Sequence, residues 1–275
     1  MPELPEVEYV ARQLRAALVG RAIVAVEVSW ARAISVPAVE AFRTAVRGRR
    51  VAAVSRRAKH LLIALDAGET LVIHRRMTGN LTLVPAGVEP LYTRVRFTLD
   101  DGRDLVFSDP RKFGRIALLA PAELQAMLAA LGPEPLEEEF TPEVLAERLA
   151  GRERGLKALL LDQAVIAGLG NIYADEALFR ARLHPLRAGA SLAPAEVAAL
   201  RWGIRDALRT GLEHGGTTIG RHRDAYDEAG TNLDHLDVYR RTGQPCRRCG
   251  TAIARILVAQ RGTHFCPRCQ PAEPS

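Results

Sequence analysis

The sequence predicts an α+β protein of two domains that ends in a small metal-binding segment. Three observations lead to this prediction. Residues 21–118 read mainly as β-strands, the pattern beyond residue 142 is helical, and all four cysteines lie between residues 246 and 269. A stretch rich in Pro and Glu at 131–142 separates the two patterns, as is typical of a domain boundary.

A helix is expected in front of the strands. Between Pro5 and Gly20 the apolar residues recur at the i, i+3, i+4, i+7 spacing of a helix with one buried face. Pro5 suits the first turn of such a helix, and Gly20 suits its end.

The remaining elements follow from the same kind of pattern. Strands are expected within 22–30, 50–84 and 94–109, and the last of these segments reads as a hairpin that turns at Asp101-Gly102. Helices are expected within 141–150, 155–166, 171–182 and 193–214. Residues 216–236 are polar and lack periodicity, which predicts a long functional loop.

These patterns divide the chain into four parts. We expect a β-rich domain at 1–130, a linker at 131–145, a helical domain with its loop at 146–236 and a zinc ribbon at 237–275. Nothing in the sequence indicates an oligomer, so we expect a monomer.

Composition limits the class of protein. The 38 basic and 32 acidic residues give a net charge of +6, which is compatible with a polyanionic partner without requiring one. No apolar stretch approaches the ~18 residues of a membrane span, and no secretion signal is visible. No cysteine outside 246–269 remains for a disulfide, which fits a reducing compartment. We therefore expect no membrane partner and a cytoplasmic, nucleoid-associated location.

The four cysteines predict a metal site. Two CxxC knuckles, Cys246-x2-Cys249 and Cys266-x2-Cys269, are typical of one structural Zn²⁺ held by four thiolates, and sixteen residues between them suit a β-hairpin. A redox function explains two knuckles at this spacing poorly. Arg261 lies near the expected hairpin tip, where it either binds a phosphate or is simply solvated.

A glycine-rich turn provides a second candidate site. Gly168 and Gly170 separate two expected helices, and Asn171 is well placed to cap the second one. A helix N-terminus after such a turn offers free backbone N–H groups to a phosphate. Ordinary helix hairpins turn on the same residues, so the pattern alone leaves both readings open.

Five motifs stand out along the chain. They are "PELPEVE" from Pro2, "HRRMTGN" at 74–80, "DPRKFGR" at 109–115, "LLLDQAVIAGLGNIYADEALF" at 159–179 and "RGTHFCPRCQ" at 261–270. Together they resemble bacterial formamidopyrimidine-DNA glycosylase, the base-excision repair enzyme for oxidised purines. The resemblance runs from Pro2 to Gln270 in the family's order. It implies an N-terminal β-sandwich, a helix-two-turn-helix domain, a zinc ribbon, and a DNA glycosylase that also cleaves abasic sites in double-stranded DNA.

The resemblance also implies the catalytic residues. Removal of Met1 would leave Pro2 as the nucleophile, with Glu3 as general acid and Lys59 and Arg261 as phosphate clamps. An α-amino group has a pKa near ~8 against ~10.4 for Lys, so more of it is unprotonated at neutral pH. Attack on C1′ would give an iminium ion that allows β,δ-elimination of the 3′ and then the 5′ phosphate.

The DNA contacts implied by the resemblance come from both halves of the chain. Met77 would fill the gap left by the extruded nucleotide, Phe113 would wedge beside the opposite strand, and Arg111 would hydrogen-bond the orphaned base. Phosphates would be bound by His74, Asn171 and Tyr239, Lys157 would lie near the damaged nucleotide, Glu176 would line the helix-turn motif, and Thr217 and Thr218 match the family's substrate loop.

The sequence departs from the family pattern in three places. "HRRMTGN" replaces the common "HLxMTG" and "VYRR" replaces "VYGR", and both changes are expected to add positive charge near the DNA path. In the loop, "GTNLDHL" at 230–236 replaces a run that contains an aromatic residue. Because the family's loop closes over the extruded base, the sequence does not reveal the preferred lesion.

Two alternatives stay open. An endonuclease VIII-like enzyme for oxidised pyrimidines shares the nucleophile, the helix-turn motif and the zinc ribbon, although the "PELPE" opening and the Met77, Arg111 and Phe113 set favour the purine enzyme. A non-catalytic binder of damaged DNA would keep the zinc and helix-turn contacts, but Pro2, Glu3 and Lys59 argue against it.

Overall fold

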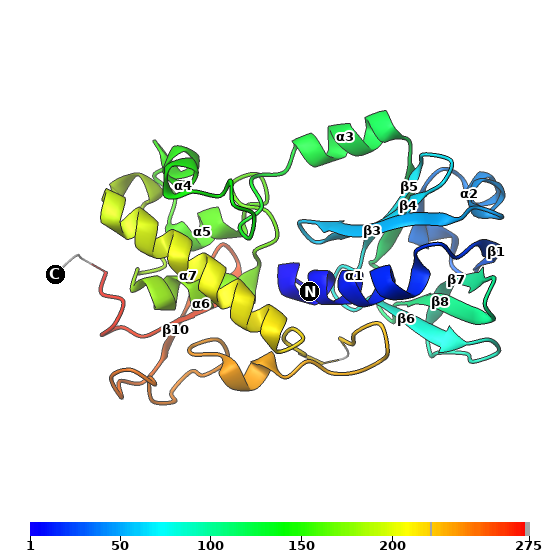
Figure 1. Cartoon of the computed structure of the whole chain (residues 1–275). Helices are drawn as coiled ribbons and strands as arrows, with labels where there is room; N and C mark the ends of the chain where they lie inside the picture. Colours follow the sequence, from blue (N-terminus) through cyan, green and yellow to red (C-terminus); the bar gives the residue numbers. More distant parts are fainter. Residues whose placement is uncertain (221, 273–275) are drawn as a thin grey trace. The chain divides into compact units, whose positions relative to one another are not determined.

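The computed structural model describes residues 1–220 and 222–272, which form two compact units (Figure 1). Unit 1 comprises Met1–Ala129 and His214–Leu233, and unit 2 comprises Ala130–Glu213 and the chain from Asp234 onward. The loop that the sequence assigns to the helical domain thus makes its contacts mainly within unit 1. Within the described residues, no helix combines the length and the apolar character that a membrane span requires.

Unit 1 contains two β-sheets. The five-stranded sheet has the order β2-β9-β5-β4-β3, with β2 Ile34–Val36, β9 Arg115–Leu119, β5 Thr70–His74, β4 His60–Leu65 and β3 Val51–Arg57. The four-stranded sheet has the order β1-β7-β8-β6, with β1 Ile23–Val28, β7 Thr93–Leu99, β8 Arg103–Ser108 and β6 Asn80–Pro85. The predicted hairpin is confirmed, since β7 and β8 pair antiparallel around a turn in which Gly102 has φ +78°.

Both sheets share one hydrophobic core, which confirms the predicted β-sandwich. Apolar side chains alternate along the strands, so that Leu61 and Ile63 of one sheet and Phe97 and Phe107 of the other belong to the same buried cluster. A strand with this alternation places one face in the core and leaves the other for solvent or a covering element.

Helix α1, Leu4–Leu18, closes this core and confirms the predicted leading helix. Its buried residues Val7, Val10, Leu14 and Leu18 recur every three or four positions. Helix α2, Val39–Val46, was not predicted. Its signal is short, an i, i+4 pair of Phe42 and Val46 that are both fully buried.

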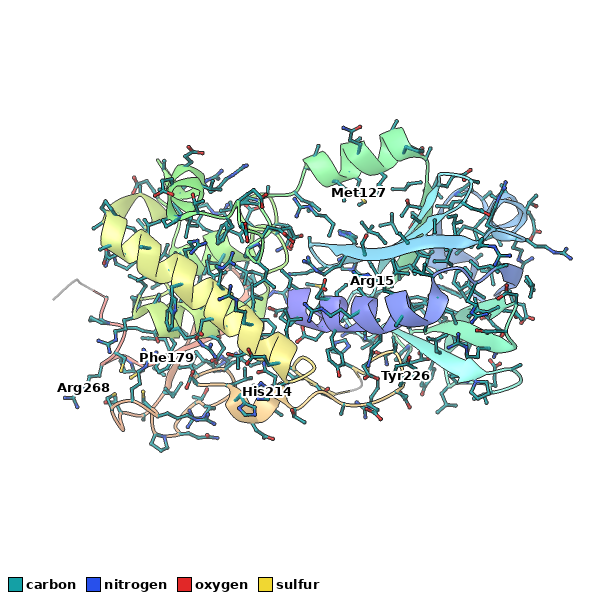
Figure 2. All side chains as sticks on the ribbon, viewed as in Figure 1. Arg15, Met127, Phe179, His214, Tyr226 and Arg268 are labelled. Atoms are coloured by element: carbon teal, nitrogen blue, oxygen red, sulfur yellow. The ribbon has the colours of Figure 1, made fainter. Side chains whose placement is uncertain are left out.

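Helix α3, Pro121–Ala129, covers the outer face of the five-stranded sheet. Leu124 and Met127 pack on a small cluster formed by Leu62, Val72 and Leu119. Met127 points from the helix toward the strands in Figure 2.

Unit 2 is helical, as predicted. Its helices are α4 Pro142–Leu149, α5 Leu156–Leu161, α6 Asn171–Ala181 and α7 Pro194–Glu213, and its 3₁₀ turn is Gly189–Ser191. Helix α5 is shorter than the segment 155–166 suggested, because the chain leaves the helix at Asp162 to form the glycine-rich turn. Gly203 of α7 lets that helix approach α6 closely, since a Cβ there would lie 2.6 Å from the carbonyl oxygen of Ala177.

The chain ends in a two-stranded hairpin, β10 Ala254–Val258 and β11 Arg261–Phe265. Both strands lie between the two CxxC knuckles, where the spacing predicted a hairpin. Two further 3₁₀ turns, Ala31–Ala33 and Asn232–His235, complete the described elements.

Candidate active site and DNA-binding surfaces

The N-terminus of unit 1 is buried and tied to its helix. Pro2 is buried, and Glu3 and Glu6 are only 3% and 7% exposed. Glu3 and Glu6 form a capping box in which the backbone N–H of Glu3 donates to Glu6 Oε2 over 2.8 Å. The first residues are therefore held in place rather than frayed, which suits a reactive group at this end.

Glu6 also joins the N-terminus to the loop. Its Oε1 accepts a hydrogen bond of 2.7 Å from the backbone N–H of Thr217. Gly216 passes so close that a Cβ there would lie 2.9 Å from the Glu6 side chain, and its φ of +85° suits glycine. One carboxylate thus contacts both Glu3 and the loop.

Thr217 and Thr218 join the two ends of the loop, residues 217–218 and 230–232, which we call its neck. The side-chain amide of Asn232 donates to Thr217 Oγ1 over 2.7 Å, and the backbone N–H of Gly230 donates to Thr218 Oγ1 over 2.8 Å. Thr217 and Thr231 also form an antiparallel bridge. The expected loop is therefore ordered at its neck; residue 221 of the predicted segment lies outside the described residues.

Lys59 and His74 lie at the ends of neighbouring strands β4 and β5. Lys59 is 5% exposed, and the ring of His74 packs edge-on against that of His60 at 4.8 Å. Burial, then the neighbouring His60 and Arg76, lower the pKa of His74 to about 3. Its Nδ1 accepts the N–H of Arg76 over 3.0 Å, so the neutral ring carries its proton on Nε2 and can donate there.

Two turns that carry predicted DNA contacts are organised by one buried carboxylate, Asp109. Its Oδ2 accepts the backbone N–H groups of Phe113 and Gly114 over 2.8 and 2.7 Å, and its Oδ1 accepts that of Arg111 over 3.1 Å. The hydroxyl of Thr78 donates to the same Oδ1 over 2.5 Å. The turn after β5 and the turn after β8 are therefore fixed to each other.

The side chains at these turns point outward. Met77 is 37% exposed and Phe113 is 48% exposed, unusual values for large apolar groups in ordered turns. The guanidinium of Arg111 lies 4.8 Å from the centre of the Phe113 ring. The structure thus brings together Met77, Arg111 and Phe113 in unit 1, and none of them is a core residue.

In unit 2, Lys157 is fully buried. Its Nζ donates to the carbonyl oxygen of Asn171 over 2.8 Å and to Asp175 Oδ1 over 2.5 Å. Its ammonium thus forms an ion pair with a buried carboxylate, and the expected place of Lys157 near the damaged nucleotide stays a prediction.

Asn171 connects helix α6 to the zinc hairpin. Its side-chain amide donates to the carbonyl oxygen of Gly262 over 2.9 Å. The helix is not capped by Asn171, as the sequence suggested, but by Gly170, and Asn171 is the first helical residue. The backbone of Gly170 is extended, so the chain turns directly into the helix there.

Two acidic residues of α6 hold the segments that follow. Asp175 Oδ2 accepts hydrogen bonds from the backbone N–H of His264 over 2.8 Å and contacts its ring Nδ1 at 3.0 Å, and the His264 ring packs against Tyr239. Glu176 accepts the three backbone N–H groups of residues 237–239 over 2.8 to 2.9 Å. Burial raises the pKa of Glu176, while these three donors act in the opposite direction.

Arg261 stands at the tip of the hairpin, as predicted, and is exposed. It pairs with Val258 across a two-residue turn of Ala259 and Gln260, which have φ values of +48° and +60°. Arg261 therefore belongs to the last residue pair of the hairpin, directly after the turn.

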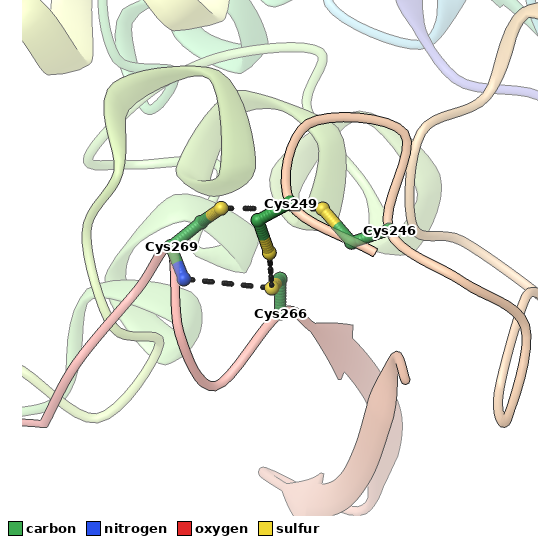
Figure 3. Close-up of side chains that lie close together, drawn as sticks. All are labelled: Cys246, Cys249, Cys266 and Cys269. Carbon is green, nitrogen blue, oxygen red and sulfur yellow. Dashed lines mark hydrogen bonds between the residues drawn. The ribbon is translucent and has the colours of Figure 1, made fainter. Parts of the chain in front are cut away.

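The four cysteines form a metal site. Their sulfur atoms lie within 4.8 Å of one another, with 3.9 Å between Cys246 and Cys269 and 3.5 Å between Cys249 and Cys266 (Figure 3). A tetrahedral Zn²⁺ with bonds of about 2.3 Å requires sulfur atoms about 3.8 Å apart, so the residues fit the ion. The predicted cofactor, one structural zinc, is confirmed.

Sequence reasoning did not single out four residues of these sites, Arg75, Asp109, Asp175 and His264. Asp109 and Asp175 lie within motifs that carry the resemblance, but nothing in those motifs distinguishes them as residues that organise the structure. Arg75 was expected to add charge near the DNA path, yet it is 2% exposed and bonded inside unit 1. No sequence pattern reveals that this arginine is buried, since one of its acceptors is a backbone carbonyl oxygen 148 residues along the chain.

Comparison with known proteins gives one consistent result. Residues 1–116 match the family model "Formamidopyrimidine-DNA glycosylase N-terminal domain", residues 131–223 match "Formamidopyrimidine-DNA glycosylase H2TH domain" and residues 243–272 match "Zinc finger found in FPG and IleRS". A formamidopyrimidine-DNA glycosylase of Roseiflexus sp. (strain RS-1) is 54% identical over 98% of this chain and 100% of its own length.

Two solved structures from Lactococcus lactis are similar over the whole chain. A mutant enzyme in complex with Fapy-dG containing DNA has a TM-score of 0.92 at 34% identity, covering 98% of this chain and 100% of that one. The wild-type enzyme in complex with oxidized pyrimidine containing DNA has a TM-score of 0.91 at 33% identity, with the same coverage.

Proposed function

This chain belongs to the formamidopyrimidine-DNA glycosylase family, and we propose that it removes oxidised purines from double-stranded DNA and cleaves the resulting abasic site through the amine of Pro2. The observation that carries the proposal is the N-terminus itself. Pro2 is buried at the start of α1, beside a carboxylate, Glu3, whose backbone is bonded to Glu6. A terminus held in this way suits a nucleophile that must meet one atom of its substrate.

The chemistry starts when Met1 is removed and the nitrogen of Pro2 becomes a secondary amine. This amine attacks C1′ of the damaged nucleotide, and the base leaves with the bonding electrons of the glycosidic bond. The bond between C1′ and the sugar ring oxygen then breaks, the ring oxygen takes up a proton, and C1′ and the nitrogen are left as an iminium ion whose positive charge does not depend on a proton at nitrogen. The cation withdraws electrons from C2′, so the 3′ phosphate and then the 5′ phosphate are eliminated.

Glu3 is placed for the proton transfers of this sequence. It follows Pro2 directly, and its side chain caps the first turn of α1. We assign to it the protonation of the sugar ring oxygen as the ring opens. Lys59 and His74, at neighbouring strand ends, would bind phosphates of the damaged strand, Lys59 as a cation and His74 through the N–H of a neutral ring.

The two turns fixed by Asp109 would act on the duplex. Met77 would occupy the space vacated by the extruded nucleotide, Phe113 would separate bases of the opposite strand, and Arg111 would donate to the orphaned base. Their exposure, together with rigid attachment to one carboxylate, supports this assignment. An apolar side chain inserted between bases must be held firmly, because the bases that it separates tend to stack again.

In unit 2, Asn171, Tyr239 and Arg261 would bind phosphates, since Asn171 and Tyr239 both contact β11, the strand that Arg261 begins. Lys157 and Glu176 would act through other residues. Lys157 holds Asn171 and Asp175, and Glu176 holds the backbone that carries Tyr239. We assign both to positioning rather than to direct contact with DNA. An enzyme that acts on bacterial chromosomal DNA would work in the cytoplasm, at the nucleoid.

Borohydride trapping tests the proposal. The protein, with its mature N-terminus verified, is mixed with duplexes that contain 8-oxoguanine opposite cytosine, a formamidopyrimidine or an oxidised pyrimidine. Reduction of the iminium ion would leave a covalent adduct on Pro2, to be located by mass spectrometry. Tight binding of every duplex without any adduct would refute the nucleophile and favour a non-catalytic binder of damaged DNA.

A second substrate class has a specific observation behind it. The wild-type Lactococcus lactis relative was crystallised with oxidized pyrimidine containing DNA, so membership of this family does not restrict recognition to purines. The altered loop at 230–236 adds weight to this alternative. An adduct that forms faster with the pyrimidine than with either purine lesion would reverse our assignment of the substrate and keep the mechanism.

A further inference from the structure

Arg75 joins two parts of unit 1 that the proposed reaction uses separately, the turn that carries Met77 and the tip of the loop at residues 222–228. We propose that Arg75, together with Asn80, is a positioning residue that locks the loop tip in place, so that excision of a base depends on it while cleavage of a pre-existing abasic site does not. The inference rests on the proposed function.

The guanidinium of Arg75 reaches three acceptors. Its Nε donates to the carbonyl oxygen of Gly79 over 2.9 Å, which closes the turn around Met77. Its Nη2 donates to Asn80 Oδ1 over 2.9 Å and to the carbonyl oxygen of Arg223 over 2.8 Å. The planar, rigid guanidinium group of arginine donates hydrogen bonds in several fixed directions. The ammonium group of lysine, on a flexible stem, does this less well.

Asn80 completes the arrangement from the other side. Its Oδ1 also accepts the backbone N–H of Arg223 over 3.2 Å. Arg75 and Asn80 thus bind both polar groups of one residue in the loop, its N–H and its C=O. We call Arg75, Asn80 and the backbone of Arg223 the loop clasp.

The tip held by the clasp has an internal structure of its own. Asp224 Oδ1 accepts the backbone N–H groups of Tyr226 and Glu228, and Ala225 accepts the N–H of Leu83 over 2.8 Å on the edge of β6. Gln13 of α1 bonds both Asp224 and Ala225. Figure 2 shows Tyr226 beside β6, where this tip adjoins the sheet. The clasp therefore positions a preformed tip rather than a loose one.

Electrostatics link the clasp to the N-terminus. Arg75 is 2% exposed, and the nearby carboxylates of Glu6 and Asp224 offset the cost of burying its charge. Glu6 is the residue that bonds both Glu3 and Thr217. Arg75, Glu6 and the loop residues Thr217, Thr218 and His222 line one small cavity. A base attached to the sugar under attack at Pro2 must lie near this loop, whereas an abasic sugar presents no base to it.

The test compares two substrates with one variant. Arg75→Met keeps an unbranched apolar stem and removes the hydrogen-bond donors of the guanidinium group. Single-turnover rates are measured for excision of 8-oxoguanine and for cleavage of a duplex with a preformed abasic site. We expect excision to slow by about tenfold or more, the effect of one lost charge-assisted hydrogen bond, with abasic-site cleavage within about twofold of the parent. Arg75→Lys, which keeps the charge but not the planar guanidinium group, should resemble Arg75→Met.

Two further variants make the result decisive. Asn80→Ala removes the other half of the clasp and should slow excision by a similar factor, without a further loss in the double variant. Arg96→Met is the matched control, because Arg96 is a buried arginine of β7 whose hydrogen bonds, in the part of the chain that the structure describes, go to Asp104, Glu89 and the carbonyl oxygen of Val88. It should not separate the two activities.

Other outcomes overturn the inference. If Arg75→Met slows both reactions by the same factor, Arg75 has a general structural role. If it slows neither, the clasp does not position the loop for catalysis. In both cases an active parent protein leaves the proposed function standing; a parent that neither excises nor cleaves would refute that function instead.

Discussion

At the scale of single residues, the proposed site depends on buried polar groups whose hydrogen-bond partners are other segments of the protein. Asp109 illustrates this role, since it is fully buried and accepts four hydrogen bonds from two turns. Burying a carboxylate is costly unless its oxygens are satisfied, and here the satisfying donors belong to the segments that must be ordered. The charge is thereby used to fix Met77, Arg111 and Phe113.

Replacing Asp109 by Asn tests this role. The amide keeps the shape but removes the charge and turns one acceptor into a donor that faces other donors. We expect a loss of about 2–4 kcal/mol in the free energy of unfolding and weaker binding to DNA with an extruded nucleotide. Urea unfolding and fluorescence anisotropy measure the two effects. Asp101→Asn, at the β7–β8 turn, is the control; equal losses in both variants would contradict the prediction.

His74 and Arg261 should differ in the way their loss affects DNA binding. The low pKa of His74, about 3, makes it a neutral donor at physiological pH, whereas Arg261 is a cation. Arg261→Ala should therefore reduce the slope of log affinity against log salt by about 0.9, and His74→Ala should weaken binding with little change of slope. Salt titrations at pH 7.5 distinguish them. A reduced slope for His74→Ala would mean that its ring is charged in the complex.

At the scale of elements, the zinc hairpin carries strain at its tip. Ala259 and Gln260 both adopt the left-handed conformation that Asn and Gly accept at lower cost. The double change Ala259→Asn and Gln260→Gly should stabilise the hairpin by about 1 kcal/mol and slow amide hydrogen exchange in β10 and β11. Exchange is measured with zinc bound; faster exchange in these strands would contradict the expectation.

Removal of zinc should act on the hairpin and spare the β-sandwich. The cluster around the cysteines is small, with Phe179, Val238 and Ile253 as its other buried members, so the metal supplies much of its stability. Cys249→Ser or chelation should abolish order in β10–β11. DNA affinity should then fall at least about tenfold, because Arg261 is no longer held in a fixed position. The exposed Thr242→Ser is the control. Undiminished affinity after metal loss would show that Arg261 is not a clamp.

At the scale of the whole molecule, the free energy of unfolding should fall at acid pH, because the folded protein keeps several histidines of unit 1 neutral. Burial lowers the pKa of His60. Burial, then His60 and Arg76, lower the pKa of His74 to about 3, and burial, then Arg75, lower that of His222 to about 3. The unfolded chain protonates near pH 6.5, so below that value it binds more protons than the folded chain, and lowering the pH favours unfolding until about pH 3.

Each such histidine should contribute a slope of up to about 1.4 kcal/mol per pH unit within this window, and none above pH 6.5. Urea unfolding between pH 7 and 4 measures the total slope. His222→Gln should make the slope shallower, whereas His235→Gln, at an exposed position, should leave it unchanged. An unchanged slope in His222→Gln would mean that His222 is not held neutral.

The sequence by itself determined the elements with strong local signals. The helix at α1, the β7–β8 hairpin, the helical second half and the zinc knuckles all follow from periodicity or from the spacing of ligands, which neighbouring residues carry. The family, and with it the expected nucleophile at Pro2, followed from motifs that are each contiguous. Short α2 escaped prediction because only two buried residues mark it.

Only the tertiary structure decided what the charged residues do. Lys157 and Arg75 carry the same signal in the sequence as any DNA-binding cation, yet Lys157 pairs with Asp175 and Arg75 binds a peptide group 148 residues away. Their roles depend on partners supplied by distant segments, and burial selects among those partners because a charge removed from water must be paired. That choice is made when the chain folds, so no local pattern contains it.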